Sequence, residues 1–234
     1  MTVIRAFTYI FSDRRFRSKL TSLAVFVLLL PFPIIGLVSL CILLGYLANI
    51  VHNISADSPN PLPDWDHIGA IIGKGIPVLL ALIVYHLPLL LAAALLAVFG
   101  DSLGLGLMTG LNTIAPVALL LYSLAAWCLW MLGLVGYAES WEADGFYQFD
   151  QALRMLQCNA PLAVEWLVSA LLVNALLLLL MPVFLMGACL MMPSHGYVTG
   201  AYARRLRAAR LAEGTEQTAD PASFLRRPSA EAVV

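Results

Sequence analysis

Four long stretches of the sequence contain no Asp, Glu, Lys or Arg: residues 20–51, 75–100, 102–138 and 166–203. A helix needs about 20 apolar residues to cross the hydrocarbon core of a bilayer, so each stretch can cross at least once. The chain as a whole is 61% hydrophobic and 12% charged, whereas about a quarter of the residues of a soluble domain are charged. The sequence therefore predicts an all-α, polytopic α-helical membrane protein.

Three of these stretches are too long for one straight crossing, and two of them, 20–51 and 166–203, contain prolines that can break the helix. As continuous helices, residues 20–51 would extend about 48 Å and residues 166–203 about 57 Å, against a core of about 30 Å. Proline lies near the middle of each, at Pro31 and Pro33 in the first and at Pro182 in the second. Because proline removes a backbone donor and clashes with the preceding turn, we expect a kink or a hairpin tip at these positions.

The length of the stretches predicts about six membrane segments arranged as three hairpins. The hairpins are at residues 20–51, 75–138 and 162–203, and the second turns at 100–110. The first leg, residues 20–31, is too short to cross the core, so a re-entrant first hairpin stays open as an alternative. Four long, bent spans are the rival arrangement, and the sequence does not decide between the two.

The predicted hairpins make one membrane domain, residues 1–208. Short interfacial segments complete it, namely a helix at 1–19 and two cytoplasmic links at 52–74 and 139–161. The N-terminal helix has two interpretations: it lies in the lipid interface, or it packs on the cytoplasmic side of the protein itself. Residues 209–234 have little apolar periodicity and are expected to form a disordered cytoplasmic tail.

Basic residues flank the apolar part of the chain on both sides. Before the first stretch they are Arg5, Arg14, Arg15, Arg17 and Lys19, and after the last they are Arg204, Arg205, Arg207, Arg210, Arg226 and Arg227. Lys and Arg are in excess on the cytoplasmic side of membrane proteins. We therefore expect a multi-pass protein of the cell membrane with both termini in the cytoplasm and an even number of crossings.

Aromatic residues recur where the predicted hairpins meet the membrane surface. A Gly-Tyr pair ends the returning leg of each hairpin, and each link contains a Trp flanked by acidic residues. Because Tyr and Trp are enriched at membrane–water interfaces, we predict interfacial anchors at Trp65, Trp141, Tyr46, Tyr137 and Tyr197. Asp64 is also expected to cap a helix that begins at Trp65.

Two polar residues near the middle of the apolar stretches, His86 and Asn174, form the candidate intramembrane polar site. Ionisable groups inside a membrane are functional hypotheses by default. His86, close to Pro88, either serves a proton relay or ligand site or hydrogen-bonds a neighbouring helix or a carbonyl freed by the proline. Asn174 is expected to hydrogen-bond between helices. His195 is expected to be solvated near the cytoplasmic end.

Acidic and histidine side chains of the two links are the only candidate ligands for a divalent cation. They are His52, Asp57, Asp64, Asp66, His67, Glu139, Glu142, Asp144 and Asp150. Their spacing matches no known cation-binding loop, so solvated charge is the preferred interpretation. No Gly-rich phosphate loop follows a strand, and neither HExxH nor GxSxG occurs. We therefore expect no metal, no cofactor and no catalytic residue.

Several segments follow one another in an order that is specific as a set. They are "AFTYIFSDRRFRSKL", "PIIGLVSLCILLGYLANI", "LPDWD", "FDQALRMLQCNAP" and "SHGYVTGAYARRL". In order and spacing they resemble the bacterial and archaeal membrane proteins grouped as Domain of Unknown Function 4013, over residues 1 to about 208. Pro193 and Gly196 depart from the more regular helix expected there. The resemblance implies a polytopic membrane fold with no assigned activity, and it transfers no catalytic residue.

These features favour a non-enzymatic membrane module that associates with a membrane-protein partner, a second copy of itself or lipid. Nothing in the sequence indicates a nucleic-acid partner. The few polar residues in the apolar stretches support this hypothesis, because a water-filled pathway needs more. The alternative is a small transporter or lipid-handling permease built on proline-broken helices. An intramembrane enzyme is a third class, for which no nucleophile and base stand at a usable spacing.

Overall fold

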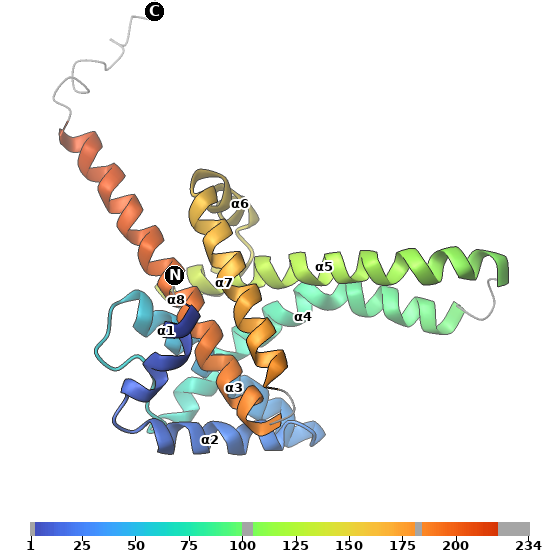
Figure 1. Ribbon diagram of the computed structural model, residues 1–234, viewed down its shortest axis with the longest axis horizontal. Helices are drawn as coiled ribbons and strands as arrows, with labels where there is room; N and C mark the ends of the chain where they lie inside the picture. The colour runs from blue at the N-terminus through green and yellow to red at the C-terminus, as the bar shows by residue number, and fades with distance from the viewer. Residues whose placement is uncertain (1–2, 100–104, 181–183, 220–234) are drawn as a thin grey trace, which may run out of the picture.

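The apolar stretches fold into helices, and short turns join them at the polar links (Figure 1). The computed structural model describes residues 3–99, 105–180 and 184–219. Its elements are α1 (Val3–Thr8), η1 (Tyr9–Ser12), α2 (Phe16–Leu29), α3 (Pro33–Ser55), α4 (Ile68–Phe99), α5 (Leu105–Ser140), η3 (Ala143–Phe146), α6 (Phe149–Cys158), α7 (Ala160–Leu179) and α8 (Phe184–Ala219). No strand occurs in these described ranges, which confirms the all-α class.

Helices α2 and α3 meet at the predicted prolines. Helix α2 ends at Leu29, and Pro33 is the first residue of α3, where the missing N–H would have no helical partner in any case. The predicted break at Pro31 and Pro33 is therefore confirmed. With 14 residues, α2 extends about 21 Å, which is shorter than a hydrocarbon core of about 30 Å. Pro182 lies outside the described residues, between the end of α7 and the start of α8.

Helix α3 is the centre of the bundle, because it packs against α2, α4, α5 and α8. Two glycines bring the backbones of α3 and α4 into direct contact. A Cβ atom on Gly75 would overlap the carbonyl oxygen of Cys41, and one on Gly45 would overlap that of Ile71. Small residues allow helices in membranes to approach this closely. The α3–α4 crossing therefore depends on the absence of side chains at these two positions.

The N-terminal segment packs on the protein, chiefly on α8. Ala6 and Ile10 are fully buried. The Tyr9 hydroxyl donates a hydrogen bond to the carbonyl of Pro193 over 2.8 Å, and its ring stacks on Tyr197 with centroids 4.8 Å apart. Burial raises the pKa of Tyr9 well above its ordinary value, so the hydroxyl stays protonated and remains a donor. The helix therefore packs on the protein, and a position in the lipid interface stays a prediction.

Helices α4 and α5 form a hairpin that projects beyond the rest of the bundle (Figure 1). At its base, the Tyr85 hydroxyl donates to the carbonyl of Phe146 over 2.5 Å. Beyond this point none of the residues 86–95 and 116–125 is buried, and none is Asp, Glu, Lys or Arg. We call these two ranges the outer hairpin. Its exposed surface is almost entirely apolar.

Four helices in the described part of the chain are long and apolar enough to cross a membrane. They cover Pro33–Ser55, Ile68–Leu95, Pro116–Ser140 and Ala160–Leu179. Their number and composition suggest a membrane protein, because a crossing needs about 20 predominantly apolar residues.

The boundaries of the first link differ from the prediction. Helix α4 begins at Ile68 and not at Trp65, so the predicted Asp64 cap is wrong. Helix α3 continues to Ser55, so the segment between the two helices is 56–67, and the rest of the predicted 52–74 link is helical. The Asp64 carboxylate instead forms an ion pair with the buried ammonium of Lys19 at 3.1 Å.

Two further predicted boundaries are too wide. Helix α5 begins at Leu105, so residues 105–110 of the predicted turn at 100–110 are helical, and residues 100–104 lie outside the described ranges. Helix α8 continues to Ala219, so residues 209–219 are helical where a disordered tail was expected. The Ala, Leu, Arg and Glu residues of this segment are strong helix formers. Residues 220–234 lie outside the described part of the chain.

Candidate functional site: the charged face

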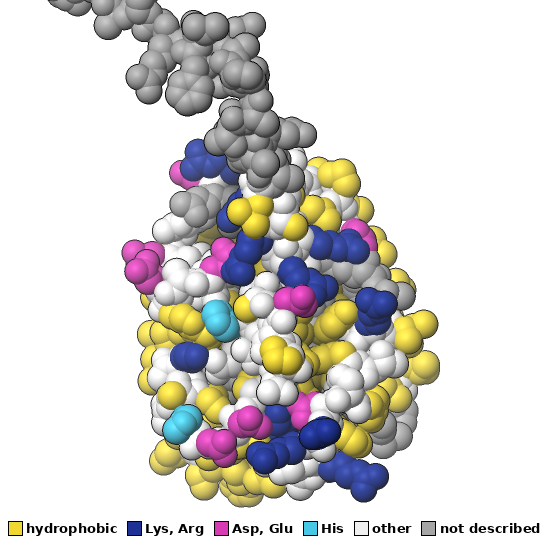
Figure 2. Space-filling view, turned by 90° about the vertical axis from the view of Figure 1, so that its left-hand side faces the viewer, with side chains coloured by type: hydrophobic (Ala, Val, Ile, Leu, Met, Phe, Trp, Pro, Cys, Tyr) yellow, Lys and Arg dark blue, Asp and Glu magenta, His cyan; other side chains and the backbone are white. Residues whose placement is uncertain are grey.

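Charged side chains gather on the face of the molecule opposite the free end of the α4–α5 hairpin (Figures 1 and 2). Four segments form it: residues 13–19, 56–67, 139–148 and 204–210. Ion pairs join them, from Lys19 to Asp64, from Arg204 to Asp57 and from Arg207 to Glu139. We call this set of segments the charged face.

Lys19 is the buried centre of one half of this face, with 4% of its surface exposed. Its ammonium pairs with Asp13 at 2.8 Å and with Asp64 at 3.1 Å, and it donates to the carbonyl of Leu62 over 2.7 Å. A buried charge is tolerated when it is paired and hydrogen-bonded in this way. The group ties the start of α2 to the 56–67 link.

Trp65 lies next to this group and packs on protein. Its ring stacks on that of Tyr46 with centroids 4.4 Å apart and an interplanar angle of 3°, and it also contacts Phe26. The indole N–H donates to the carbonyl of Lys19 over 3.3 Å. Trp65 therefore fixes the link against α2 and α3.

Lys74 of α4 contacts the 139–148 segment of the face through Trp141. Its ammonium donates to Asn49 Oδ1 over 2.7 Å and lies 3.6 Å from the centre of the Trp141 ring. The carbonyl of Lys74 accepts a hydrogen bond from the Tyr137 hydroxyl over 2.9 Å. No carboxylate pairs with Lys74 within the described ranges. The cation is instead stabilised by an amide oxygen and the face of an aromatic ring.

Trp141 is held in a left-handed backbone conformation with φ of 61°. Its N–H donates to the carbonyl of Tyr137 over 2.7 Å and so caps the end of α5, a position usually occupied by Gly or Asn. The ring also lies 5.1 Å from that of His52, whose Nδ1–H donates to the carbonyl of Ala138 over 2.7 Å. Lys74 and His52 therefore surround a strained tryptophan.

Arginines of α8 pair with acidic residues from three different segments. The pairs are Arg204 with Asp57, Arg205 with Glu165 at 2.6 Å, Arg207 with Glu139 at 3.4 Å and Arg210 with Glu139 at 4.0 Å. The arginine side chains are 44–48% exposed, so each pair stabilises the fold by no more than about 1 kcal/mol. Together they place the ends of α3 and α5 and the start of α7 beside α8.

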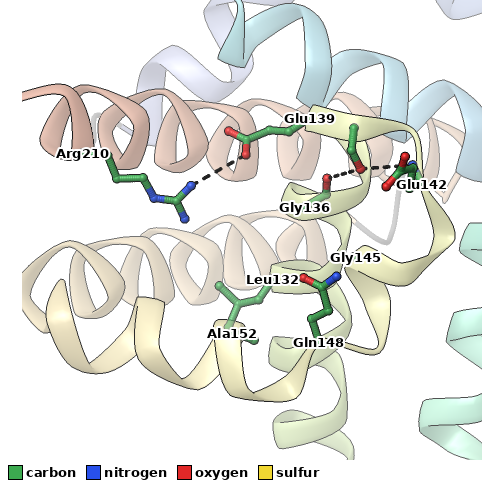
Figure 3. A pocket seen from close by; sticks show the side chains of 9 residues that line it. Leu132, Gly136, Glu139, Glu142, Gly145, Gln148, Ala152 and Arg210 are labelled. Carbon is green, nitrogen blue, oxygen red and sulfur yellow. Dashed lines mark hydrogen bonds and ion pairs between the residues drawn. The ribbon is translucent and has the colours of Figure 1, made fainter. Parts of the chain in front are cut away.

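A cavity of about 270 Å³ lies between the end of α5, η3, α6 and α8 (Figure 3). Its lining consists of Leu132, Gly136, Glu139, Ser140, Glu142, Gly145, Gln148, Ala152 and Arg210. The Ser140 hydroxyl donates to the carbonyl of Gly136 over 3.3 Å and accepts from the N–H of Glu142 over 3.1 Å. The cavity is a polar depression with two carboxylates, those of Glu139 and Glu142, in its lining.

The two candidate intramembrane residues do not meet. His86 on α4 donates from Nδ1 to the carbonyl of Leu82 in its own helix over 2.9 Å. Asn174 on α7 has its Oδ1 atom 3.2 Å from His195 Nε2 on α8, which is a hydrogen bond between helices of the kind predicted. His195 is only 3% exposed, so the prediction of a solvated side chain is wrong. Helix α8 buries it against α7 and Trp127.

Sequence reasoning missed a polar and aromatic cluster around this contact. Trp127 stacks on Trp166 with centroids 6.0 Å apart, and Trp166 lies 5.6 Å from Tyr202. Among the described residues, three buried side-chain atoms have no hydrogen-bond partner: Trp166 Nε1, Ser194 Oγ and the Tyr202 hydroxyl. Unpaired buried groups of this kind commonly bind water. The available signal was the polar and aromatic content of "WLVSALLVN" and "SHGYVTGAY" in otherwise aliphatic stretches.

The model of one protein family matches residues 25–191, and its description is "Protein of unknown function (DUF4013)". The match covers more than half of the 234 residues. The chain belongs to the DUF4013 family. This confirms the family that the sequence motifs indicated. No curated protein and no solved structure matches the chain.

The DUF4013 match begins within α2 and ends within α8. It includes both links of the charged face, with Lys74 and Trp141, and the two candidate intramembrane residues. Lys19 and the arginines of α8 lie outside the matched residues. The family description assigns no function, so any function must be argued from the residues themselves.

The five predicted anchors have different surroundings. Tyr46 and Tyr137 are 1% and 2% exposed, so they contact protein where lipid headgroups were expected. Trp65, Trp141 and Tyr197 are half-buried, and for these three an interfacial position stays a prediction.

The acidic and histidine residues of the links do not converge on one point. Within the described ranges, no group of three or more His, Cys, Asp or Glu side chains is arranged to hold a metal ion. Asp57, Asp64 and Glu139 instead pair with Arg or Lys side chains.

Proposed function

We propose that this DUF4013 protein is a multi-pass protein of the cell membrane that acts as a non-enzymatic module. It associates with a membrane-protein partner or with lipid through the outer hairpin. The exposed apolar surface of the outer hairpin carries the proposal. Leu90, Leu95 and Leu120 are 57%, 57% and 69% exposed. A helix that is apolar all round needs a membrane or a protein to cover it, and contiguous patches of this kind mark interaction surfaces.

The ion pairs of α8 support a topology in which every hairpin starts and returns on one side. Asp57 follows α3, Glu139 lies at the end of α5 and Glu165 lies near the start of α7, and all three pair with arginines of α8. Lys19 likewise links the start of α2 to the segment before α4. By the positive-inside bias this side is cytoplasmic, and both termini lie there. This arrangement favours three hairpins over four bent spans.

The contacts of His86 and Asn174 favour a module over a permease. The two residues lie on helices with different neighbours, since α4 packs on α3 and α5, and α7 packs on α8. A transporter site near the midplane would need its polar groups to converge.

Photo-crosslinking tests the association. A photoreactive amino acid is placed at Leu90 or Leu120 in the outer hairpin, and at the fully buried Leu134 as the matched control. We expect stoichiometric adducts with one protein, with a second copy or with lipid from the first two positions, and none of these from Leu134. Equal adduct yields at all three positions, or none from the outer hairpin, would overturn the proposed association.

Cysteine labelling tests the membrane topology separately. Cys158 on α6 is exposed, whereas Cys41 and Cys189 are buried. A membrane-impermeant maleimide should label Cys158 in inside-out vesicles and leave it unlabelled in intact spheroplasts. Labelling from the outside would contradict the orientation, and release of the protein by alkaline carbonate would contradict membrane integration.

A further inference from the structure

The two groups of basic residues on the charged face differ in their partners. All four arginines at 204–210 pair with carboxylates. In contrast, no carboxylate of the described ranges pairs with Arg5, Arg14, Arg15 or Arg17. The N-terminal arginines therefore keep an uncompensated positive charge.

The carboxylates of Asp13 and Asp64 pair with Lys19 and with neither Arg14 nor Arg15. The distances to the Lys19 ammonium are 2.8 Å for Asp13 and 3.1 Å for Asp64. The side chain of Asp13 is only 6% exposed, so it is directed into the protein. Arg14 and Arg15 are exposed. Their guanidinium groups can therefore bind an anion that is not part of the protein.

A cavity of about 550 Å³ lies beside these two arginines. One wall is formed by Ser12, Asp13, Arg14, Arg15 and Lys19, and the other by Pro59, Asn60, Pro61 and Asp64. Three cations and two carboxylates line it, and both carboxylates are engaged by Lys19. The cavity is therefore polar, of net positive charge and open to one side.

An exposed apolar side chain is next in sequence to the cavity. Phe11, which precedes the lining residue Ser12, is 54% exposed. Phe11 packs edge-on against Phe16, and the guanidinium of Arg17 lies 5.8 Å from the centre of the Phe16 ring. Apolar groups next to cations match the boundary between the acyl chains and the anionic headgroups of a bilayer.

We infer that residues 11–17 and the 59–64 wall form a binding site for the headgroup of an anionic phospholipid. Arg14 and Arg15 bind the phosphate in the cavity, because guanidinium groups recognise phosphate through paired N–H donors. Phe11 contacts the acyl region. The inference rests on the proposed membrane function and names the lipid class that it recognises. A lipid is preferred to a free phosphate because apolar residues border the arginines.

Native mass spectrometry of the full-length protein in detergent tests the site. The protein is titrated with phosphatidylglycerol and, separately, with zwitterionic phosphatidylcholine. Wild-type protein should bind phosphatidylglycerol more tightly, and R14Q/R15Q should weaken that binding by at least about tenfold while phosphatidylcholine binding stays unchanged. The double substitution R226Q/R227Q removes the same charge from the C-terminal segment and should leave both affinities unchanged.

A second variant approaches the cavity from its other wall. Asn60→Asp places a carboxylate opposite the arginines and should also weaken phosphatidylglycerol binding, without altering any basic residue. Equal binding of the two lipids, an unaltered affinity in both R14Q/R15Q and N60D, or an equal loss in R226Q/R227Q would overturn the inference. Displacement of the lipid by millimolar inorganic phosphate would show a free-anion site instead. None of these results would contradict the proposed integration into the membrane, which carbonate extraction tests separately.

Discussion

The ammonium of Lys74 lies 3.6 Å from the centre of the Trp141 ring, and this contact joins α4 to the end of α5. Trp141 adopts φ of 61°, a conformation that costs a bulky residue of order 1–3 kcal/mol. The cation, the neighbouring His52 ring and the hydrogen bond to Tyr137 offset that cost. The strained Trp141 therefore helps to hold α4 against the end of α5.

A double-mutant cycle measures the Lys74–Trp141 contact. Trp141→Leu should lower the free energy of unfolding by about 2 kcal/mol, because it removes both ring packing and the cation–π contact. Lys74→Met and the double variant should then show a coupling of about 1 kcal/mol. Reversible unfolding in mixed detergent micelles gives these values. Lys74→Arg, which keeps the charge, is the control and should retain most of the coupling, while additive effects would contradict the contact.

Gly75 and Gly73 form a matched pair on α4. A Cβ at Gly75 would overlap the backbone of α3, whereas a Cβ at Gly73 would have no atom within 4 Å. Gly75→Ala should therefore destabilise the protein by about 2 kcal/mol or more, because the helices must separate. Gly73→Ala should be neutral or stabilising by up to about 1 kcal/mol, since Ala is the better helix former. Circular-dichroism melting in detergent checks both, and similar melting temperatures would refute the close crossing.

The sequence predicted the position of a helix correctly where a single local pattern, such as a proline or an uncharged stretch, determines it. Pro33 begins α3 because proline fits a first helical turn, and the uncharged stretches gave the long helices. The ion pair between Asp64 and Lys19 did not follow, because it joins residues that are far apart in the sequence. Burial of His195 was missed for the same reason, since its partner Asn174 lies on another helix.

For the charged face, the sequence predicted the types of residue but not their contacts. Acidic links and basic termini were evident in the sequence, but which charges pair was not. The contact of Lys74 with Trp141 depends on the left-handed backbone conformation of Trp141. No local sequence pattern predicts that conformation for a tryptophan. Tyr46 likewise has the residue type of an interfacial anchor, yet the stack with Trp65 buries it.

Removal of the buried ammonium of Lys19 should be costly. Lys19→Met leaves Asp13 buried without its partner, and breaking a buried pair typically costs 3–5 kcal/mol. Arg17→Met, an exposed residue of the same helix, should change the stability by less than about 0.5 kcal/mol. Unfolding in mixed micelles compares the two variants. Asp13→Asn added to Lys19→Met should recover part of the loss, and no recovery would show that Lys19 acts through packing alone.

Asn174 and His195 provide the test that separates a structural contact from a transport site. Asn174→Ala leaves the buried His195 without its partner, and hydrogen bonds between helices in membranes contribute about 0.6 kcal/mol on average and at most about 1.7 kcal/mol. We expect a loss of about 1 kcal/mol in unfolding experiments. His86→Ala should cost less, since its hydrogen bond stays within α4. In reconstituted vesicles neither substitution should alter the flux of lipid or small solutes, because the two side chains do not share a site. A matching loss of flux in both variants would reverse this assignment and favour a permease.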